Sequence, residues 1–234
     1  MRIGPVWMSS RAPDWRGAPS LDDRTAGLRH LRRCGVRLLN LAQPDPVAAR
    51  QAGYRQVMTG ATLAIVPLDR PLRDNMQQKW RNRLWAGLAN PITVESRNFT
   101  LPADQWLLAA DRIQQRQRGY RGYPCRFLAQ LALHGMTRLF LCHFAGEVIA
   151  AMLMAQHGSM ASYLIGWTGP VGRRTHAHNV LMDAAMHYYQ SLGLRALDLG
   201  TIDTQAAAGL ARFKLGTGAQ PSLTGGTWIG FGNH

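Results

Sequence analysis

A lysine near the carboxyl end of the sequence stands in a segment bounded by glycines. Lys214 follows Phe213, and the pair lies between Gly209 and the run Gly216-Thr217-Gly218. Glycines at such places allow a ligand to approach the backbone closely, within reach of the lysine's positive charge. The sequence holds only two lysines beside 25 arginines, which sets Lys214 apart from the general basic background. The alternative interpretation is a surface lysine beside a packed phenylalanine.

A second candidate for chemistry is a basic loop ahead of a helix. Gly172, Arg173, Arg174 and Thr175 precede a helix expected from about Asn179. A glycine-bearing loop that leads into a helix N-terminus is a natural anion site, because the backbone N–H groups and the helix dipole both attract negative charge. The two arginines would strengthen it. A merely solvated basic loop is the alternative.

Two aspartates lie at or just after the end of the strand expected at residues 195–199. Asp198 lies at its end, where a carboxylate could act as a general base or orient an amine; it could equally cap a turn. Asp203 lies a few residues further along. An aspartate stands at the matching place in a repeat described below, so Asp203 is interpreted as structural.

Four further residues are candidates for substrate binding. Lys79 and Arg83 are four residues apart and therefore share a face of a helix expected at residues 76–88. This face is either a clamp for a phosphorylated substrate or an ordinary solvated surface. Tyr163 and Trp167 lie on a strand expected at residues 161–167 and are predicted to line the core or a cleft.

Composition narrows the class of partner. The net charge is +14 and the isoelectric point is near 11.1, which indicates an anionic partner such as a phosphate-bearing carrier. No segment approaches the ~20 apolar residues of a membrane-spanning helix, and the first residues do not resemble a signal peptide. We therefore expect a cytoplasmic protein, with the membrane surface as the alternative location. Three scattered cysteines predict no disulfide framework, and His176 with His178 lacks an evident third ligand, so no metal site is expected.

An internal repeat organises the chain. Residues 35–49 align without gaps with residues 193–207, an offset of 158, with seven of fifteen positions identical. Each copy has a strand, a loop, a helix that ends before a glycine, and a second strand. Such a unit is expected to place its two strands parallel. The sequence thus predicts an α/β fold with two domains, a truncated one at 1–70 and a complete one at 71–234. Helices are expected at 103–117 and 124–134, and a hairpin at 138–144 and 148–156.

Several segments resemble the FemAB-like peptidyltransferases, which consist of two tandem GNAT acyltransferase folds. Ile3-Gly4-Pro5-Val6 is similar to a stretch of that family's first domain. The end of that domain is similar to Gly53-Tyr54 and the following residues 62–68. Lys79-Trp80-Arg81-Asn82-Arg83 is similar to the helix that begins the second domain. The segment 193–218, with its Phe213-Lys214 pair, is the most specific part of the match.

The resemblance implies a GNAT-like mixed sheet flanked by helices, in tandem, with an incomplete N-terminal copy. It also implies an N-acyltransferase that moves an acyl or aminoacyl group from acyl-CoA or aminoacyl-tRNA to an amine. Lys214 and Asp198 would be catalytic, with Lys214 contacting the carrier's phosphate or the oxyanion, and Phe213 would join Gly172 to Thr175 in binding the carrier. The usual coenzyme A signature is incomplete, because His176 and His178 replace its glycine or alanine. The alternative function is that of a non-catalytic remnant that acts as an interaction or assembly protein. Self-association or binding of a partner protein is also open.

Overall fold

The computed structural model describes residues 2–3, 6–10, 13, 15 and 17–231. Gly4 and Pro5 of the first-domain resemblance therefore lie outside the described residues. The chain divides into two units, one of residues 1–63 with 221–234 and one of residues 64–220. Among the described residues, no helix is long and apolar enough to cross a bilayer.

The first unit is a five-stranded sheet with two helices. Its strand order is β1-β2-β3-β12-β4, and β2 and β3 run parallel, as predicted. Helix α1 begins after Ser20, whose hydroxyl and Asp23 form a reciprocal capping box. The elements are β1 (Arg2–Ile3), β2 (Val6–Ser10), α1 (Leu21–Arg33), β3 (Val36–Leu41), α2 (Pro46–Gln51), β4 (Tyr54–Met58) and β12 (Gly226–Gly230).

The second unit carries a seven-stranded mixed sheet in the order β11-β5-β10-β9-β8-β7-β6. Strands β6 to β9 pair antiparallel, and β9 and β10 are parallel, joined through α6 and α7. The first elements are β5 (Thr62–Pro67), α3 (Gln78–Leu88), β6 (Ile92–Asn98), α4 (Gln105–Arg118), α5 (Cys125–Leu133), β7 (Thr137–Phe144) and β8 (Glu147–His157). The remaining ones are β9 (Met160–Thr168), α6 (Pro170–Arg174), α7 (Ala177–Ser191), β10 (Ala196–Thr201), α8 (Ala208–Gly216) and β11 (Gln220–Leu223).

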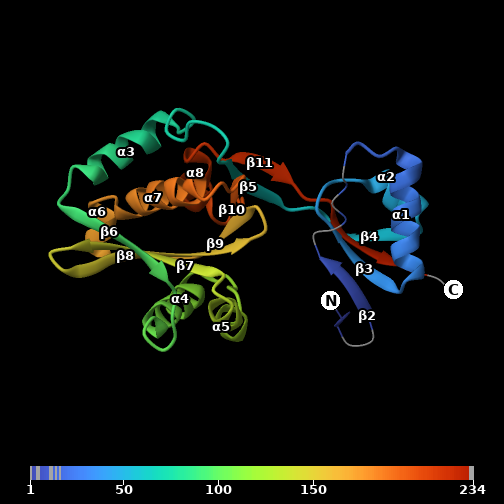
Figure 1. The fold of residues 1–234 in the computed structure, drawn as a ribbon, viewed down its shortest axis with the longest axis horizontal. Helices are drawn as coiled ribbons and strands as arrows, with labels where there is room; N and C mark the ends of the chain where they lie inside the picture. The colour runs from blue at the N-terminus through green and yellow to red at the C-terminus, as the bar shows by residue number, and fades with distance from the viewer. Residues whose placement is uncertain (1, 4–5, 11–12, 14, 16, 232–234) are drawn as a thin grey trace. The chain divides into compact units, whose positions relative to one another are not determined.

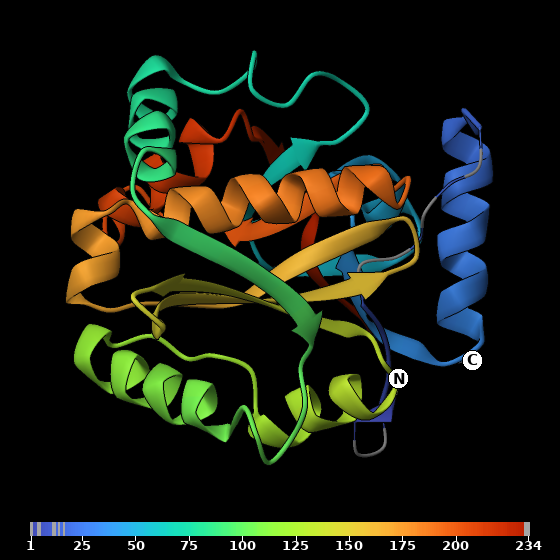
Figure 2. The same cartoon turned by 60° about the vertical axis from the view of Figure 1, so that its left-hand side comes forward.

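Helices cover both faces of this second sheet. Helices α3 and α7 lie on one face, and α4 and α5 lie on the other (Figures 1 and 2). Side chains alternate between the two faces of each strand, so the sheet has an apolar core on each face. Phe140 and Met152 pack beneath α3 and α7, whereas Leu139 and Leu153 pack against α4 and α5. The unit is the three-layered, mixed α/β arrangement that the sequence predicted.

The two repeats exchange a strand, which the sequence analysis did not predict. Strand β5, at the end of the first repeat, lies between β10 and β11 of the second sheet, and β12 lies between β3 and β4 of the first. Residues 62–68 therefore do not close the first domain as expected. The unit boundary falls near residue 63 rather than 70, and the last strand joins the first unit.

Candidate active site in the second unit

The parallel strands β9 and β10 separate partway along their length. Their pairing ends where Asp198 lies opposite Ser162, and no later pair of the two strands is found among the described residues. On its other side, β9 has an irregularity in register opposite Leu153 and Met154, between Tyr163 and Ile165. The backbone of β9 from Tyr163 to Thr168 therefore lacks a β10 partner, and the sheet opens there.

Lys214 is held in the last turn of α8 next to this opening. Its side chain is buried, and its Nζ donates a hydrogen bond of 2.8 Å to the carbonyl oxygen of Thr201, at the end of β10. Gly200, at φ +80°, precedes that residue, and a Cβ there would lie 3.5 Å from Nζ. Burial lowers the pKa of Lys214, while the negative charge of Asp198 opposes that shift. The structure thus brings together a buried amine and a carboxylate that the sequence analysis singled out.

Asp198 does not look like a free base. Its side chain is 2% exposed, and its Oδ1 accepts a hydrogen bond of 2.7 Å from the backbone N–H of Gly200. The carboxylate therefore shapes the turn that points the Thr201 carbonyl at Lys214. Asp203 likewise accepts from the N–H groups of Gln205 and Ala206, at 2.9 and 2.8 Å, which agrees with its structural interpretation.

A histidine that the sequence placed in the coenzyme A signature, and that was weighed there as a metal ligand, lies at the centre of the candidate site. His178, on α7, has its Nε2 3.1 Å from the Tyr163 hydroxyl and its Nδ1 3.2 Å from the Thr168 hydroxyl. Burial lowers the pKa of His178 to about 4, so the imidazole is neutral at physiological pH. Burial likewise raises the pKa of Tyr163, which remains a phenol. A Cβ at Gly166 would overlap the Tyr163 hydroxyl, so only glycine admits this arrangement.

Phe213 joins this group to α3. Its ring lies 5.4 Å from the ring of His178 and 5.9 Å from that of Trp80. Trp80 is buried, and its Nε1 has no hydrogen-bond partner in the described part of the chain. The adjacent Gly216 leaves room for the indole, since a Cβ there would lie 3.0 Å from the Cβ of Trp80. An aromatic wall therefore borders Lys214.

The basic loop is a short helix rather than an open loop. Residues 170–174 form α6, and a Cβ at Gly172 would overlap the carbonyl oxygen of Ile149. The side chains of Arg173 and Arg174 are exposed and form no hydrogen bond or ion pair with other described residues, whereas the Thr175 hydroxyl donates to the Val171 carbonyl at 3.0 Å. His176 then adopts φ +53° before α7 begins, which explains why the coenzyme A signature has a glycine at this place.

The remaining predicted site residues lie further out. Lys79 and Arg83 are exposed on α3, and their side chains make no ion pair or hydrogen bond within the described ranges. Trp167 packs edge-on against Trp106 of α4, at 5.5 Å between ring centroids. No cluster of three or more His, Cys, Asp or Glu suited to a metal ion occurs in the described part of the chain.

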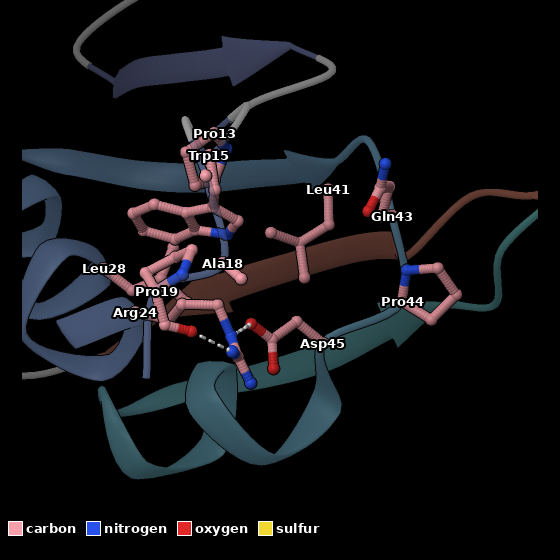
Figure 3. Close-up of a pocket in the computed structure, with 11 residues that line it drawn as sticks. Pro13, Trp15, Ala18, Pro19, Arg24, Leu28, Leu41, Gln43, Pro44 and Asp45 are labelled. Carbon is pink, nitrogen blue, oxygen red and sulfur yellow. Dashed lines mark hydrogen bonds and ion pairs between the residues drawn. The ribbon is translucent and has the colours of Figure 1, made fainter. Parts of the chain in front are cut away.

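The first unit has a cavity of about 400 Å³ at the carboxyl end of β3 (Figure 3). Arg24 and Asp45 point toward one another inside it, with Arg24 Nε donating to Asp45 Oδ2 at 2.8 Å (Figure 3). By the repeat offset, Gln43 and Asp45 correspond to Thr201 and Asp203. In the second repeat, the Thr201 carbonyl accepts the hydrogen bond from Lys214. In the first repeat, the Arg24–Asp45 ion pair lies beside the equivalent position, Gln43.

Comparison with known proteins identifies the family. The profile of the family described as "Acetyltransferase (GNAT) domain" matches residues 97–221, just over half of the chain. The chain therefore belongs to the GNAT acetyltransferase family, and its tandem arrangement is FemAB-like. No curated protein sequence matches it significantly.

Solved structures of this fold resemble the whole chain. The crystal structure of FemX superposes with a TM-score of 0.72 at 14% identity, covering 92% of this chain and 78% of FemX. The C-terminal domain of a putative lysylphosphatidylglycerol synthetase from Agrobacterium fabrum gives 0.59 at 14% identity, covering 91% and 73%. The L-PGS of Bacillus licheniformis gives 0.54 at 14% identity, covering 86% and 70%.

Proposed function

We propose that the second unit transfers an acyl or aminoacyl group from a phosphate-bearing carrier to an amine, at the opening between β9 and β10. The observation that carries the proposal is the buried Lys214 amine, held by the Thr201 carbonyl beside unpaired β9 backbone. Unpaired strand groups can hydrogen-bond an extended substrate, as an added strand would.

Lys214 stabilises the negative charge that develops on the acyl oxygen when the amine attacks. A positive group in a water-poor site is effective there because its field is weakly screened. Asp198 fixes the turn around Gly200 and keeps Lys214 in place. His178, being neutral, adds no competing charge, and together with Tyr163 and Phe213 it forms the wall against which the donor lies.

Aminoacyl-tRNA is the donor we favour over acetyl-CoA, the co-substrate that the family description suggests. In the coenzyme A signature a small residue occupies the place of His178. Here the imidazole fills the space between Tyr163, Thr168 and Phe213. The lysyl-phosphatidylglycerol synthetase name of one structural neighbour also implies an aminoacyl donor for that protein. Exposed Arg173 and Arg174 would contact the carrier's phosphates, and Lys79 with Arg83 an anionic part of the acceptor.

The test is donor use by the full chain and by Lys214→Met, which keeps the side chain's length but removes its charge. We expect the wild type to catalyse transfer of a labelled amino acid from aminoacyl-tRNA to an added amine. Lys214→Met should lose about 10²- to 10³-fold in the rate of transfer, the usual cost of removing one oxyanion donor. Arg195→Ala, an exposed site on the connection before β10, serves as the control.

Acetyl-CoA is assayed in parallel. Transfer from acetyl-CoA alone would show that the donor we favour is wrong but would leave the proposed site unchanged. Use of neither donor, or wild-type rates in a folded Lys214→Met, would contradict the proposal and favour a non-catalytic interaction protein.

A further inference from the structure

A second cavity in the first unit is lined by several arginines. It has a volume of about 650 Å³ and lies where the end of α1, α2, the start of β4 and the end of β12 meet. Arg32, Arg50 and Arg55 line it, together with Tyr54 and Phe231. None of the described lining residues is acidic. Three guanidinium groups around one hollow form a strongly positive site.

The position of Arg32 is fixed by its surroundings. Its Nη1 donates a hydrogen bond of 3.0 Å to the Phe231 carbonyl. A Cβ placed on Gly53, where φ is +87°, would lie 3.0 Å from the guanidinium carbon, so glycine makes room for the stacked group. The guanidinium is thus held in one orientation before any ligand arrives, which lowers the entropic cost of binding.

One donor of this arginine is left without a partner. The Nε of Arg32 is buried and has no hydrogen bond among the described residues. A buried donor without an acceptor is costly, and Arg32 is one of the groups that an anion in the cavity would meet. The side chains of Arg50 and Arg55 are exposed and form no ion pair in the described part of the chain, so both are available to the same anion.

The aromatic ring at the rim narrows the class of ligand. Phe231 is 61% exposed beside the three guanidinium groups. Exposed aromatic rings and guanidinium planes both stack on nucleobases, and arginine pairs with phosphate through two parallel hydrogen bonds. Tyr54, the other ring in the lining, is buried, so Phe231 is the ring that is available for stacking.

We propose that this cavity, formed by Arg32, Arg50, Arg55 and Phe231, binds a nucleoside phosphate, either free or as one unit of an RNA strand. The phosphate lies among the guanidinium groups, and the base stacks on Phe231. The residues that line this cavity all belong to the first unit, whereas Lys214 belongs to the second, and the proposal does not depend on the acyl-transfer activity.

The test is binding of adenosine monophosphate, adenosine and a labelled ten-nucleotide RNA to the full chain, followed by calorimetry and fluorescence anisotropy. We expect adenosine monophosphate to bind at least tenfold more tightly than adenosine, because only the former has a phosphate. Tighter, more salt-dependent binding of the RNA would identify a strand as the source, and comparable binding would identify a free nucleotide; both outcomes support the site.

The variants keep the test independent of folding. Arg50→Gln with Arg55→Gln removes two arginines that hold no other described group, and we expect at least tenfold weaker binding. The control, Arg116→Gln with Arg195→Gln, changes two exposed arginines of the second unit by the same total charge and should alter affinity less than twofold. Equal loss in the two double variants, equal binding of adenosine, or binding only to phosphatidylglycerol vesicles would overturn the proposal.

Discussion

Burial keeps the His178 side chain neutral in the pH range where histidines usually titrate. Its pKa falls to about 4 because the ring is enclosed by Tyr163, Thr168 and Phe213. Protonation would place a positive charge in this enclosed space. The neutral state is therefore part of the design of the site.

The lowered pKa has a consequence for stability. The unfolded chain binds a proton at His178 near pH 6.5, whereas the folded chain does so only near pH 4. Stability contributed by the neutral ring is therefore complete above pH 6.5 and is lost as the pH falls toward 4. We expect a loss of about 1–3 kcal/mol in the free energy of unfolding between these values, reduced from the ideal figure by the ring's partial exposure.

Denaturant unfolding at pH 7.0 and 4.5 measures this loss. His178→Gln should show a smaller difference between the two pH values than the wild type. His134→Gln, at the exposed end of α5, is the matched control and should retain the wild-type difference. An unchanged difference in His178→Gln would show that other groups cause the acid sensitivity.

At the scale of elements, an ion pair secures α7 to the segment before α3. Arg73 donates to both oxygens of Asp183, at 3.2 and 2.8 Å, and its guanidinium lies over the Trp85 ring. Asp183 is 5% exposed, and the hydrogen bonds that Arg73 donates to its carboxylate raise the pKa of Arg73. The two elements that flank the aromatic wall are thereby joined.

Arg73→Ala should therefore cost about 2–3 kcal/mol in unfolding free energy, because a buried carboxylate loses its arginine partner and keeps only His187, at 3.5 Å, while the arginine itself is partly exposed. The control is Arg70→Ala, which breaks the exposed pair with Asp69 and should cost less than about 0.5 kcal/mol. Chemical denaturation of both variants measures the comparison. Equal costs would mean that burial of Asp183 does not strengthen the pair.

Much of this element structure could be predicted from the sequence. Glycine at 35 and 193 ends two helices and starts two strands, so both parallel crossovers were recognised, and the 138–156 hairpin follows from its turn. Strand β6 was missed because its sequence, with Glu95, Arg97 and Asn98, is that of a polar edge strand. The exchange of β5 and β12 was also missed, because alternation predicts a strand but not its neighbour.

The sequence indicated the candidate site only in part, for a similar reason. Lys214, Asp198 and Phe213 carry local signals of type and spacing, and they do lie around one opening. His178 depends on burial by residues from β9 and α8, which its own sequence neighbourhood does not reveal. Its place in a signature that calls for a small residue was the one signal available.

At the scale of the whole molecule, the exchanged strand makes the first sheet depend on residues at the other end of the chain. Trp228 on β12 is 1% exposed and packs in the core of the first unit, and its Nε1 donates to the Gly225 carbonyl at 2.8 Å. Strands β3 and β4 both pair with β12. Without it, the middle of that sheet is missing.

Trp228→Ala should destabilise the first unit by about 3–5 kcal/mol, the usual cost of removing a buried indole. We expect faster amide hydrogen exchange in β3 and β4, with protection retained in β7 and β8. Val57→Ala, an exposed position on β4, is the control and should leave exchange in β3 unaffected. Uniform loss of protection across both sheets would instead show that the chain unfolds as one cooperative body.

The exchanged strand also sets the order in which the protein can be completed during synthesis. Strand β4 ends at Met58, but the strand that fills the gap beside it begins only at Gly226. At roughly 5–20 residues per second, the ribosome needs on the order of ten seconds to cover that distance. Throughout this interval, β3 and β4 present open hydrogen-bonding edges, which are sites of mispairing. The second sheet acquires its own borrowed strand before the rest of it is made, so it is the half that can mature first.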